Sequence, residues 1–264
     1  MEVLSWVGAI APIVVLFLLM SVFHVRTQRA ALLGIVCAAA AALLVGQSAV
    51  SIVGMDLLKG AYSAFNILIV IWPAVFLYEM LEHGGVFAQI RAMLQAQTQD
   101  TMMLVLLIAW VFSSFLQGIT GFGVPVAVCA PILIAIGVRP LWSVMLTLLG
   151  HAWANTYGTF ALGWDALITQ SETTAVWQTK LYAGFFLWGI DLIGGLLICC
   201  FLARGRGVRH MLPFVLLIST VHGGGQLLVS FFNSTIAAFL PTTIALVVAF
   251  VLLRCGAYTK PWKV

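Results

Sequence analysis

The residues best suited to chemistry in this 264-residue chain lie in a short polar run between two apolar segments. The run, residues 115–125, reads FLQGITGFGVP and holds three glycines, a glutamine, a threonine and a proline. Glycine permits backbone conformations that other residues resist, and proline is favoured in the first turn of a helix. The pattern predicts a break in one helix and a new helix beginning near Pro125, whose N–H groups could hold a carboxylate. The alternative is a glycine-rich packing contact between helices.

Two polar residues in the following apolar run could face the same cavity. His151 and Asn155 are four residues apart, so in a helix they share one face. Such residues are costly inside a membrane span unless they face water or the bundle interior, although they could also join helices as structural hydrogen bonds. The predicted substrate-binding residues are Gln117, Gly118, Thr120, Gly121, Phe122, Gly123, Pro125, His151 and Asn155.

Two residues are candidates for carrying a proton. His151 can titrate near neutral pH. Asp191, in LWGIDLIGG, is an acidic residue deep in an apolar run, which suggests either a proton relay or a structural pairing. A third polar group, His222 to Gln226 (HGGGQ), predicts a second break or a loop at the outer end of a span.

The elements that must position these residues are membrane helices. The chain is 63% hydrophobic and 8% charged, with a mean hydropathy of +1.14, whereas about a quarter of the residues of a soluble domain are charged. A spanning helix needs about 20 apolar residues. We therefore expect an all-α polytopic membrane protein, one domain over 1–264, with a retained first span. Seven apolar runs fit spans: 5–23, 30–46, 61–79, 141–160, 181–203, 211–229 and 234–253.

The segment 102–137 is predicted to be a broken or re-entrant helical hairpin. Its apolar arms, 102–114 and 126–137, would each reach about 18–20 Å, less than the bilayer core of about 30 Å. The preceding segment, 80–100, suggests either a helix lying at the interface or a packed cytoplasmic helix.

The basic residues predict the orientation of the chain. Cytoplasmic loops are enriched in lysine and arginine, so the N-terminus is expected outside and the C-terminus in the cytoplasm. The segment 161–180 then lies outside. The basic residues used are Arg26, Arg29, Arg204, Arg206, Arg209, Arg254, Lys260 and Lys263.

Several classes of protein are disfavoured. The net charge of +4 is scattered, without the basic stripe of a nucleic-acid-binding protein. The five cysteines form no C-x-x-C pair. They suggest buried thiols and do not suggest a metal site or a disulfide framework. The sequence has no H-E-x-x-H motif and no P-loop, so we expect no enzyme activity, metal or cofactor.

The stretch 119–163, from ITGFGVPVAVCAPILIAIG to GHAWANTYGTFALG, resembles the bacterial L-lactate permease family, as does FLYEMLEHGGVFAQIRAML at 76–94. The resemblance implies proton-coupled symport of L-lactate or a similar short 2-hydroxy monocarboxylate, such as glycolate, across the bacterial inner membrane. It places Gly121, Phe122, Gly123 and Pro125 in the family's signature loop.

The chain departs from the family pattern at two positions and in length. Gln117 stands where the family often has glutamate, and a neutral amide cannot carry the transported proton. Val124 replaces a threonine. The family is about twice as long, which implies a second half-transporter chain or a homo-oligomer as partner. The alternative function is therefore a non-transporting membrane subunit, or a truncated half that needs a partner.

Overall fold

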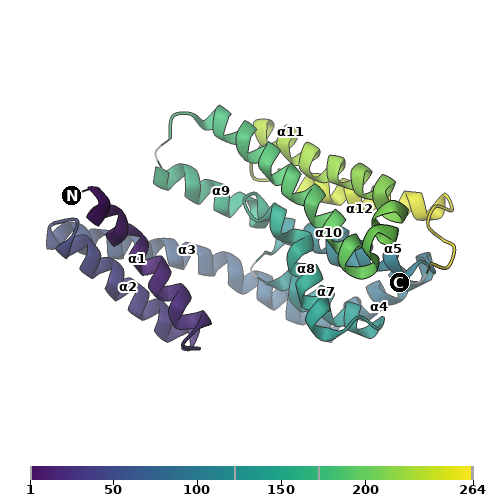
Figure 1. Ribbon diagram of the computed structural model, residues 1–264, viewed down its shortest axis with the longest axis horizontal. Coiled ribbons are helices and arrows are strands. Elements are labelled where there is room, and N and C mark those ends of the chain that lie inside the picture. The colour runs from purple at the N-terminus through teal and green to yellow at the C-terminus, as the bar shows by residue number, and fades with distance from the viewer. Residues whose placement is uncertain (1, 122, 172, 263–264) are drawn as a thin grey trace. The chain divides into compact units, whose positions relative to one another are not determined.

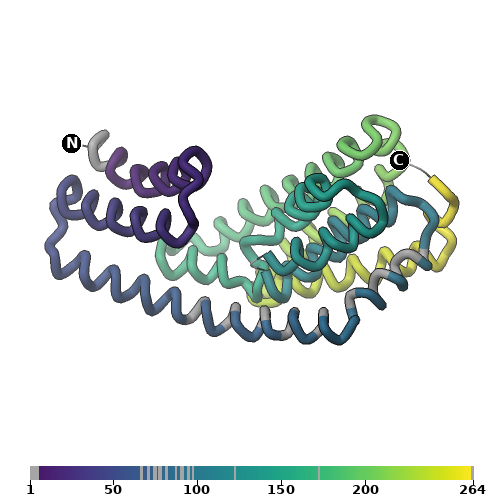
Figure 2. Tube along the Cα trace, turned by 90° about the horizontal axis from the view of Figure 1, so that it is seen from below, coloured from purple at the N-terminus to yellow at the C-terminus, as the bar shows by residue number. Residues whose placement is uncertain are grey.

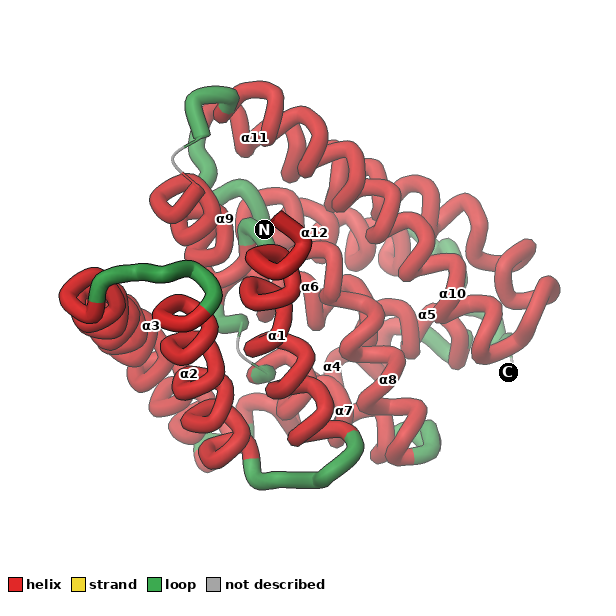
Figure 3. The backbone as a smooth tube through the Cα atoms, turned by 60° about the vertical axis from the view of Figure 1, so that its left-hand side comes forward, coloured by secondary structure: helices red, strands yellow, loops and turns green. Residues whose placement is uncertain are grey.

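The computed structural model describes residues 2–121, 123–171 and 173–262 as helices joined by short connections (Figures 1 and 3). The α-helices are α1 (Glu2–Ser21), α2 (Thr27–Leu44), α3 (Val50–His83), α4 (Val86–Gln97), α5 (Thr101–Leu106), α6 (Ser113–Ile119), α7 (Val124–Ala135), α8 (Pro140–His151), α9 (Gly158–Ser171), α10 (Val176–Ser219), α11 (Gly225–Phe232) and α12 (Phe239–Arg254). Two π-helical segments, η1 (Leu107–Phe112) and η3 (Thr220–Gly224), and one 3₁₀ turn, η2 (Ala152–Ala154), lie between them.

The lengths and surfaces of these helices confirm an all-α polytopic membrane protein. Among the described residues, three stretches are long and apolar enough to cross a bilayer: Thr27–Leu44, Thr101–Ile119 and Val176–Phe232. Large apolar side chains cover the outside, and Phe186 and Phe232 are 74% and 90% exposed. Such surface requires lipid to cover it, because water would make its exposure unfavourable.

The chain divides into two compact units, Met1–Val70 and Ile71–Val264, with the boundary inside α3. In the first unit, α1 and α2 form an antiparallel hairpin. A Cβ added to Gly8 would lie 3.1 Å from Val45, and one added to Gly34 would lie 3.4 Å from Leu16. Small residues thus allow these two membrane helices to approach closely. The prediction of a single domain stays a prediction.

The second unit is built around the continuous helix Thr101–Ile119, which comprises α5, η1 and α6. Residues 102–114 are all buried, and the helix packs against α7, α8, α10 and α12. Helix α10 bends at Ala203 and Arg204, where Arg204 has φ 51° and ψ −145°, and its second part leads through η3 into α11. Helices α10, α11 and α12 contact one another at the edge of this unit (Figure 1).

Two predicted boundaries need correction. The first hairpin arm was predicted to end near residue 114, but the helix continues to Ile119 because Gly118 packs against the backbone of Phe239 and supports another turn. Only the second arm, α7 with 12 residues, is short, at about 18 Å. The predicted outer segment 161–180 is mostly helical, since α9 extends to Ser171 and α10 begins at Val176.

At one end of the second unit, the side chain of Asp100 caps the N-terminus of α5. The Asp100 carboxylate accepts hydrogen bonds from the backbone N–H groups of Met102 and Met103, at 2.9 and 3.1 Å. Its other oxygen lies 2.6 Å from Nε2 of His210, whose ring stacks on Trp262. The N–H of Thr101 donates to the carbonyl of Trp262, so the C-terminal segment lies beside the start of α5 (Figure 2).

Replacing this cap should destabilise the second unit. Asp100→Ala removes a buried carboxylate that accepts two backbone bonds, and we expect the free energy of unfolding to fall by about 2–3 kcal/mol. Denaturant titration of the detergent-solubilised protein, followed by circular dichroism, measures the change. Asp56→Ala is the matched control, because Asp56 is exposed and lies 3.7 Å from Lys59, a pair worth less than about 1 kcal/mol. Equal losses in both variants would contradict the role of the cap.

Candidate functional site

The glycine-rich run breaks the chain's central helix, as predicted. Helix α6 ends at Ile119, and α7 begins at Val124. Between them Gly121 and Gly123 have φ of 57° and 87°, in the left-handed region that favours glycine. Phe122, predicted as a member of this site, lies outside the described residues.

The start of α7 offers fewer free donors than the sequence suggests. The N–H of Val124 donates to the carbonyl of Gly121 at 3.0 Å, and Pro125 has no N–H group. The N–H of Ala127 donates to the carbonyl of Gly123, the first regular bond of the helix. An anion at this helix end would therefore draw on the amides of Gly123 and Val126 and on nearby side chains.

A pair of side-chain amides lies beside the break. Nε2 of Gln117 donates to Oδ1 of Asn155 at 3.0 Å, with Gln117 buried and Asn155 exposed. A Cβ added to Gly158 would lie 2.9 Å from the Gln117 carbonyl oxygen, so the two segments touch closely. The structure thus brings Gln117 and Asn155 together, although they are 38 residues apart in the sequence.

A second helix is also interrupted at this place. Helix α8 ends at His151, and a 3₁₀ turn follows. Farther on, Thr159, Phe160 and Ala161 have φ of 50°, 53° and 65°. Left-handed backbone costs about 1–2 kcal/mol for each residue other than glycine, so the surrounding contacts must hold it. A Cβ added to Gly121 would collide with Oγ1 of Thr159, which shows that the two breaks are in contact.

His151 and Asn155 do not share a helical face, contrary to prediction, because the helix ends between them. The Nδ1–H of buried His151 donates to the carbonyl of Thr147 at 2.6 Å, one turn back in α8. No hydrogen bond joins His151 to Asn155 within the described part of the chain. Of the other predicted residues, Gly118 lies on α6 and packs against Phe239, and Thr120 caps the end of α6, where its hydroxyl donates to the carbonyl of Leu116.

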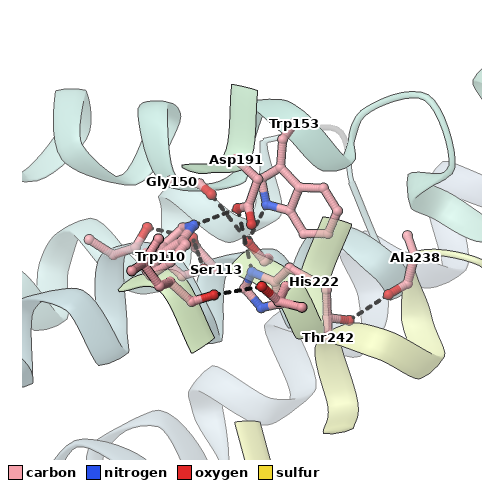
Figure 4. A network of polar contacts seen from close by, with 12 residues as sticks. Trp110, Ser113, Gly150, Trp153, Asp191, His222, Ala238 and Thr242 are labelled. Carbon is pink, nitrogen blue, oxygen red and sulfur yellow. Dashed lines mark hydrogen bonds and ion pairs between the residues drawn. The ribbon is translucent and has the colours of Figure 1, made fainter. Parts of the chain in front are cut away.

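A buried polar cluster lies in the core of the second unit (Figure 4). Nε1–H of Trp110 donates to Oδ1 of Asp191 at 2.7 Å, and Nδ1 of His222 lies 3.5 Å from the same oxygen. The side chains of Asp191 and His222 have no exposed surface. The His222 ring stacks on Trp153 at 5.0 Å and meets Trp110 edge-on at 5.5 Å. Asp191 thus has an ionisable partner.

The cluster holds polar atoms that lack hydrogen bonds. Among the described residues, no partner is found for Oδ2 of Asp191, for either ring nitrogen of His222, or for either amide atom of Gln226. Buried polar atoms are normally paired, so a group of unpaired ones makes this cluster a candidate functional site. The cluster also lies at a π-helical segment, which is frequent at such sites.

Sequence reasoning found Asp191 and missed its partner, since it interpreted the HGGGQ run as a break or an outer loop. That interpretation is wrong, because the run continues the helix through η3 into α11. The glycines serve close packing: a Cβ on Gly223 would lie 2.5 Å from Cα of Trp188, and one on Gly225 would lie 2.9 Å from Pro241. The sequence did contain a signal for this pair: Asp191 and His222 are ionisable residues in the two apolar runs that flank the same arginine-rich turn.

The break and the buried cluster are connected through η2. Nε1–H of Trp153 donates to Oγ of Ser114 at 3.0 Å, and the Ser114 hydroxyl donates to the carbonyl of Gly150 at 3.1 Å (Figure 4). Asn155, two residues after Trp153, accepts the bond from Gln117. One short segment therefore contacts His222 on one side and the broken helix on the other.

A cavity of about 520 Å³ lies at the other end of α5 and α7. It involves no residue of the break. The cavity extends from Thr101 to the bend of α10, and its lining includes Arg139. The lining residues are Thr101, Val105, Ile136, Gly137, Val138, Arg139, Trp142, Phe201 and Leu202.

Comparison with known proteins gives a consistent result. The sequence model of the family described as L-lactate permease matches residues 5–263. An L-lactate permease of Halalkalibacterium halodurans is 30% identical over 88% of this chain and 45% of its own length. The glycolate permease GlcA of Escherichia coli and an L-lactate permease of Salmonella typhi are each 28% identical over 98% of this chain and 46% of theirs. The chain thus spans about half the length of these relatives. No solved structure matches.

Proposed function

This chain belongs to the L-lactate permease family, and we propose that it is a secondary transporter of L-lactate or a similar short 2-hydroxy monocarboxylate, such as glycolate. In this proposal the anion crosses the inner, cytoplasmic membrane of a bacterial cell together with a proton. The observation that carries the proposal is the break at Gly121–Gly123, where a helix end and two side-chain amides meet inside a membrane protein. Broken helices form substrate sites in many secondary transporters.

The site offers matching groups to such a substrate. The positive end of α7 favours a carboxylate, and the amides of Gly123 and Val126 can donate to it. Because the Thr120 hydroxyl donates to Leu116, its oxygen remains able to accept a bond from the substrate 2-hydroxyl group. The Asn155 amide is exposed and can reach a ligand, while Gln117 fixes its orientation. In this proposal Phe122 is a further substrate-binding residue, and His151 or Asp191 carries the proton.

Uptake by proteoliposomes tests the proposal. We expect saturable uptake of labelled L-lactate that an inside-alkaline pH gradient stimulates. Glycolate should compete, whereas acetate, which lacks the hydroxyl group, should compete poorly. The proposal would be overturned if the protein showed no saturable uptake and no saturable binding of any 2-hydroxy acid.

A second candidate function is a membrane subunit that transports only with a second half-transporter chain or a second copy of itself. The observation that favours it is the share of the relatives, 45% to 46%, that this chain covers. Lactate uptake that appears only after a second membrane chain co-purifies, or only in a crosslinked dimer, would support it. Uptake by the isolated monomer would exclude it.

The orientation can be tested independently of transport. We expect the N-terminus outside and the C-terminus in the cytoplasm, supported by the meeting of Asp100, His210 and Trp262 at one end of the second unit. Alkaline phosphatase inserted at Thr174 should therefore be active, because it folds outside the cytoplasm, and a fluorescent protein fused after the C-terminus should fluoresce. Inactive phosphatase at Thr174 with a dark C-terminal fusion would show the opposite orientation.

A further inference from the structure

Asp191 and His222 are two ionisable side chains in an apolar core, with no exposed surface. An isolated charge is costly in such surroundings, so a proton that binds between the two side chains removes the net charge of the pair. If that proton leaves, the charge on Asp191 keeps one hydrogen bond, from Trp110. The pair can thus exist in two states that differ by one proton.

The neighbouring elements add no competing charge at the pair. Helix α5, η1, η2 and α11 contribute no ionisable residue, only Trp110, Trp153 and Gln226. Helix α8 contributes His151, whose Nδ1–H is bound to Thr147, and α12 carries only exposed Arg254 in its last turn. On α10 itself, Lys180 donates to the carbonyl of Ser230 and His210 contacts Asp100. The three arginines of α10, Arg204, Arg206 and Arg209, are exposed. Both members of this pair are fully buried, whereas His210 of the other described Asp–His pair, with Asp100, is partly exposed.

A change of charge on His222 would be felt at the broken helix. Its ring lies 5.0 Å from the Trp153 ring and nearly parallel to it, at 21°. An imidazolium ion attracts an indole face more strongly than a neutral imidazole does. Trp153 belongs to η2, which leads directly to Asn155 and its bond from Gln117. Protonation can therefore alter the position of the side chain that the anion contacts.

We infer that Asp191 and His222 together bind the transported proton, and that Trp153 transmits its presence to the anion site at Gly121–Gly123. The inference rests on the proposed function. One proton adds to the pair as one monocarboxylate binds, so the protein gains no net charge. Both leave on the other side of the membrane, and the pair returns to the deprotonated state. This assigns to His222 a role that Gln117 cannot fill, since an amide does not titrate.

Binding measurements test the inference even in a chain that does not transport alone. In nanodiscs with a pH-indicating dye, wild-type protein should take up about one proton for each L-lactate bound. Asp191→Asn and His222→Gln should bind L-lactate and lose this proton uptake. His210→Gln is the matched control, because it removes the histidine of a different Asp–His pair, with Asp100, and should keep the wild-type stoichiometry.

A second measurement guards against variants that fail to fold. In wild-type protein, the infrared difference spectrum on L-lactate binding should gain the bands of an imidazolium ring, because the bound proton gives the His222 ring its positive charge. Trp153→Leu should keep proton binding but uncouple it from lactate affinity, whereas Trp153→Phe, which retains an aromatic ring, should preserve part of the coupling. Proton uptake that persists in both pair variants, or lactate binding by wild type without a proton or the infrared band, would overturn the inference. Absence of lactate binding by wild type would instead overturn the proposed function.

Discussion

Gly150→Ala is expected to lower the free energy of unfolding by about 3 kcal/mol, because α8 crosses η1 at this glycine with backbone against backbone. A Cβ here would collide with the carbonyl oxygen of Ala109 and lie 2.9 Å from Cα of Trp110. Neither neighbour is a flexible side chain, so the two helices must separate. The shift would also displace the Trp110 indole that donates to Asp191.

Denaturant titration in detergent, with circular dichroism as the signal, measures this loss. Gly189→Ala is the matched control, since Gly189 lies in α10 with no atom within 4 Å of an added Cβ. Its effect should stay within about 0.5 kcal/mol. If both substitutions cost the same, the close crossing at Gly150 does not stabilise the unit as the structure indicates.

The broken helix could be predicted from the sequence because its cause is local. Three glycines permit backbone angles that interrupt a helix, a proline fixes its own φ, and the structure turns at Gly121 and Gly123. The polar side chains of Gln117 and Asn155 also marked them as candidates for one site, and they form a hydrogen bond, with Gln117 buried and Asn155 exposed. The membrane environment followed from composition alone, because no soluble core could bury that much apolar surface.

The remaining features depend on contacts between segments that are distant in sequence. Nothing local to Thr159, Phe160 and Ala161 predicts left-handed backbone, which the packing of α6 against this segment holds in place. The π-helical turn at His222 likewise depends on glycines packing against Trp188 and Pro241. Glycine in a membrane helix has two uses, a break or a close contact, and single-sequence patterns do not separate them.

Gly121 combines both uses of glycine, because it lies at the break and also in a close contact with Thr159. It is therefore the most informative position in the proposed anion site. Gly121→Ala is expected to weaken L-lactate binding by about thirtyfold or more. Left-handed backbone at alanine and a collision in a packed site together cost about 2 kcal/mol or more, and 1.4 kcal/mol corresponds to a tenfold change in affinity. Gly121 has φ 57°, and an added Cβ would collide with Oγ1 of Thr159. Isothermal titration calorimetry in nanodiscs measures the affinity.

Two further variants separate the collision from the backbone cost. Gly123 has φ 87° but no atom within 4 Å of an added Cβ, so Gly123→Ala should carry only the backbone term and a smaller loss. Combining Gly121→Ala with Thr159→Ala removes the colliding oxygen and should recover part of the affinity, because the remaining neighbours of the new Cβ lie at 3.4 Å. A double variant as weak as Gly121→Ala alone would mean that the contact between the two interrupted helices does not shape the anion site.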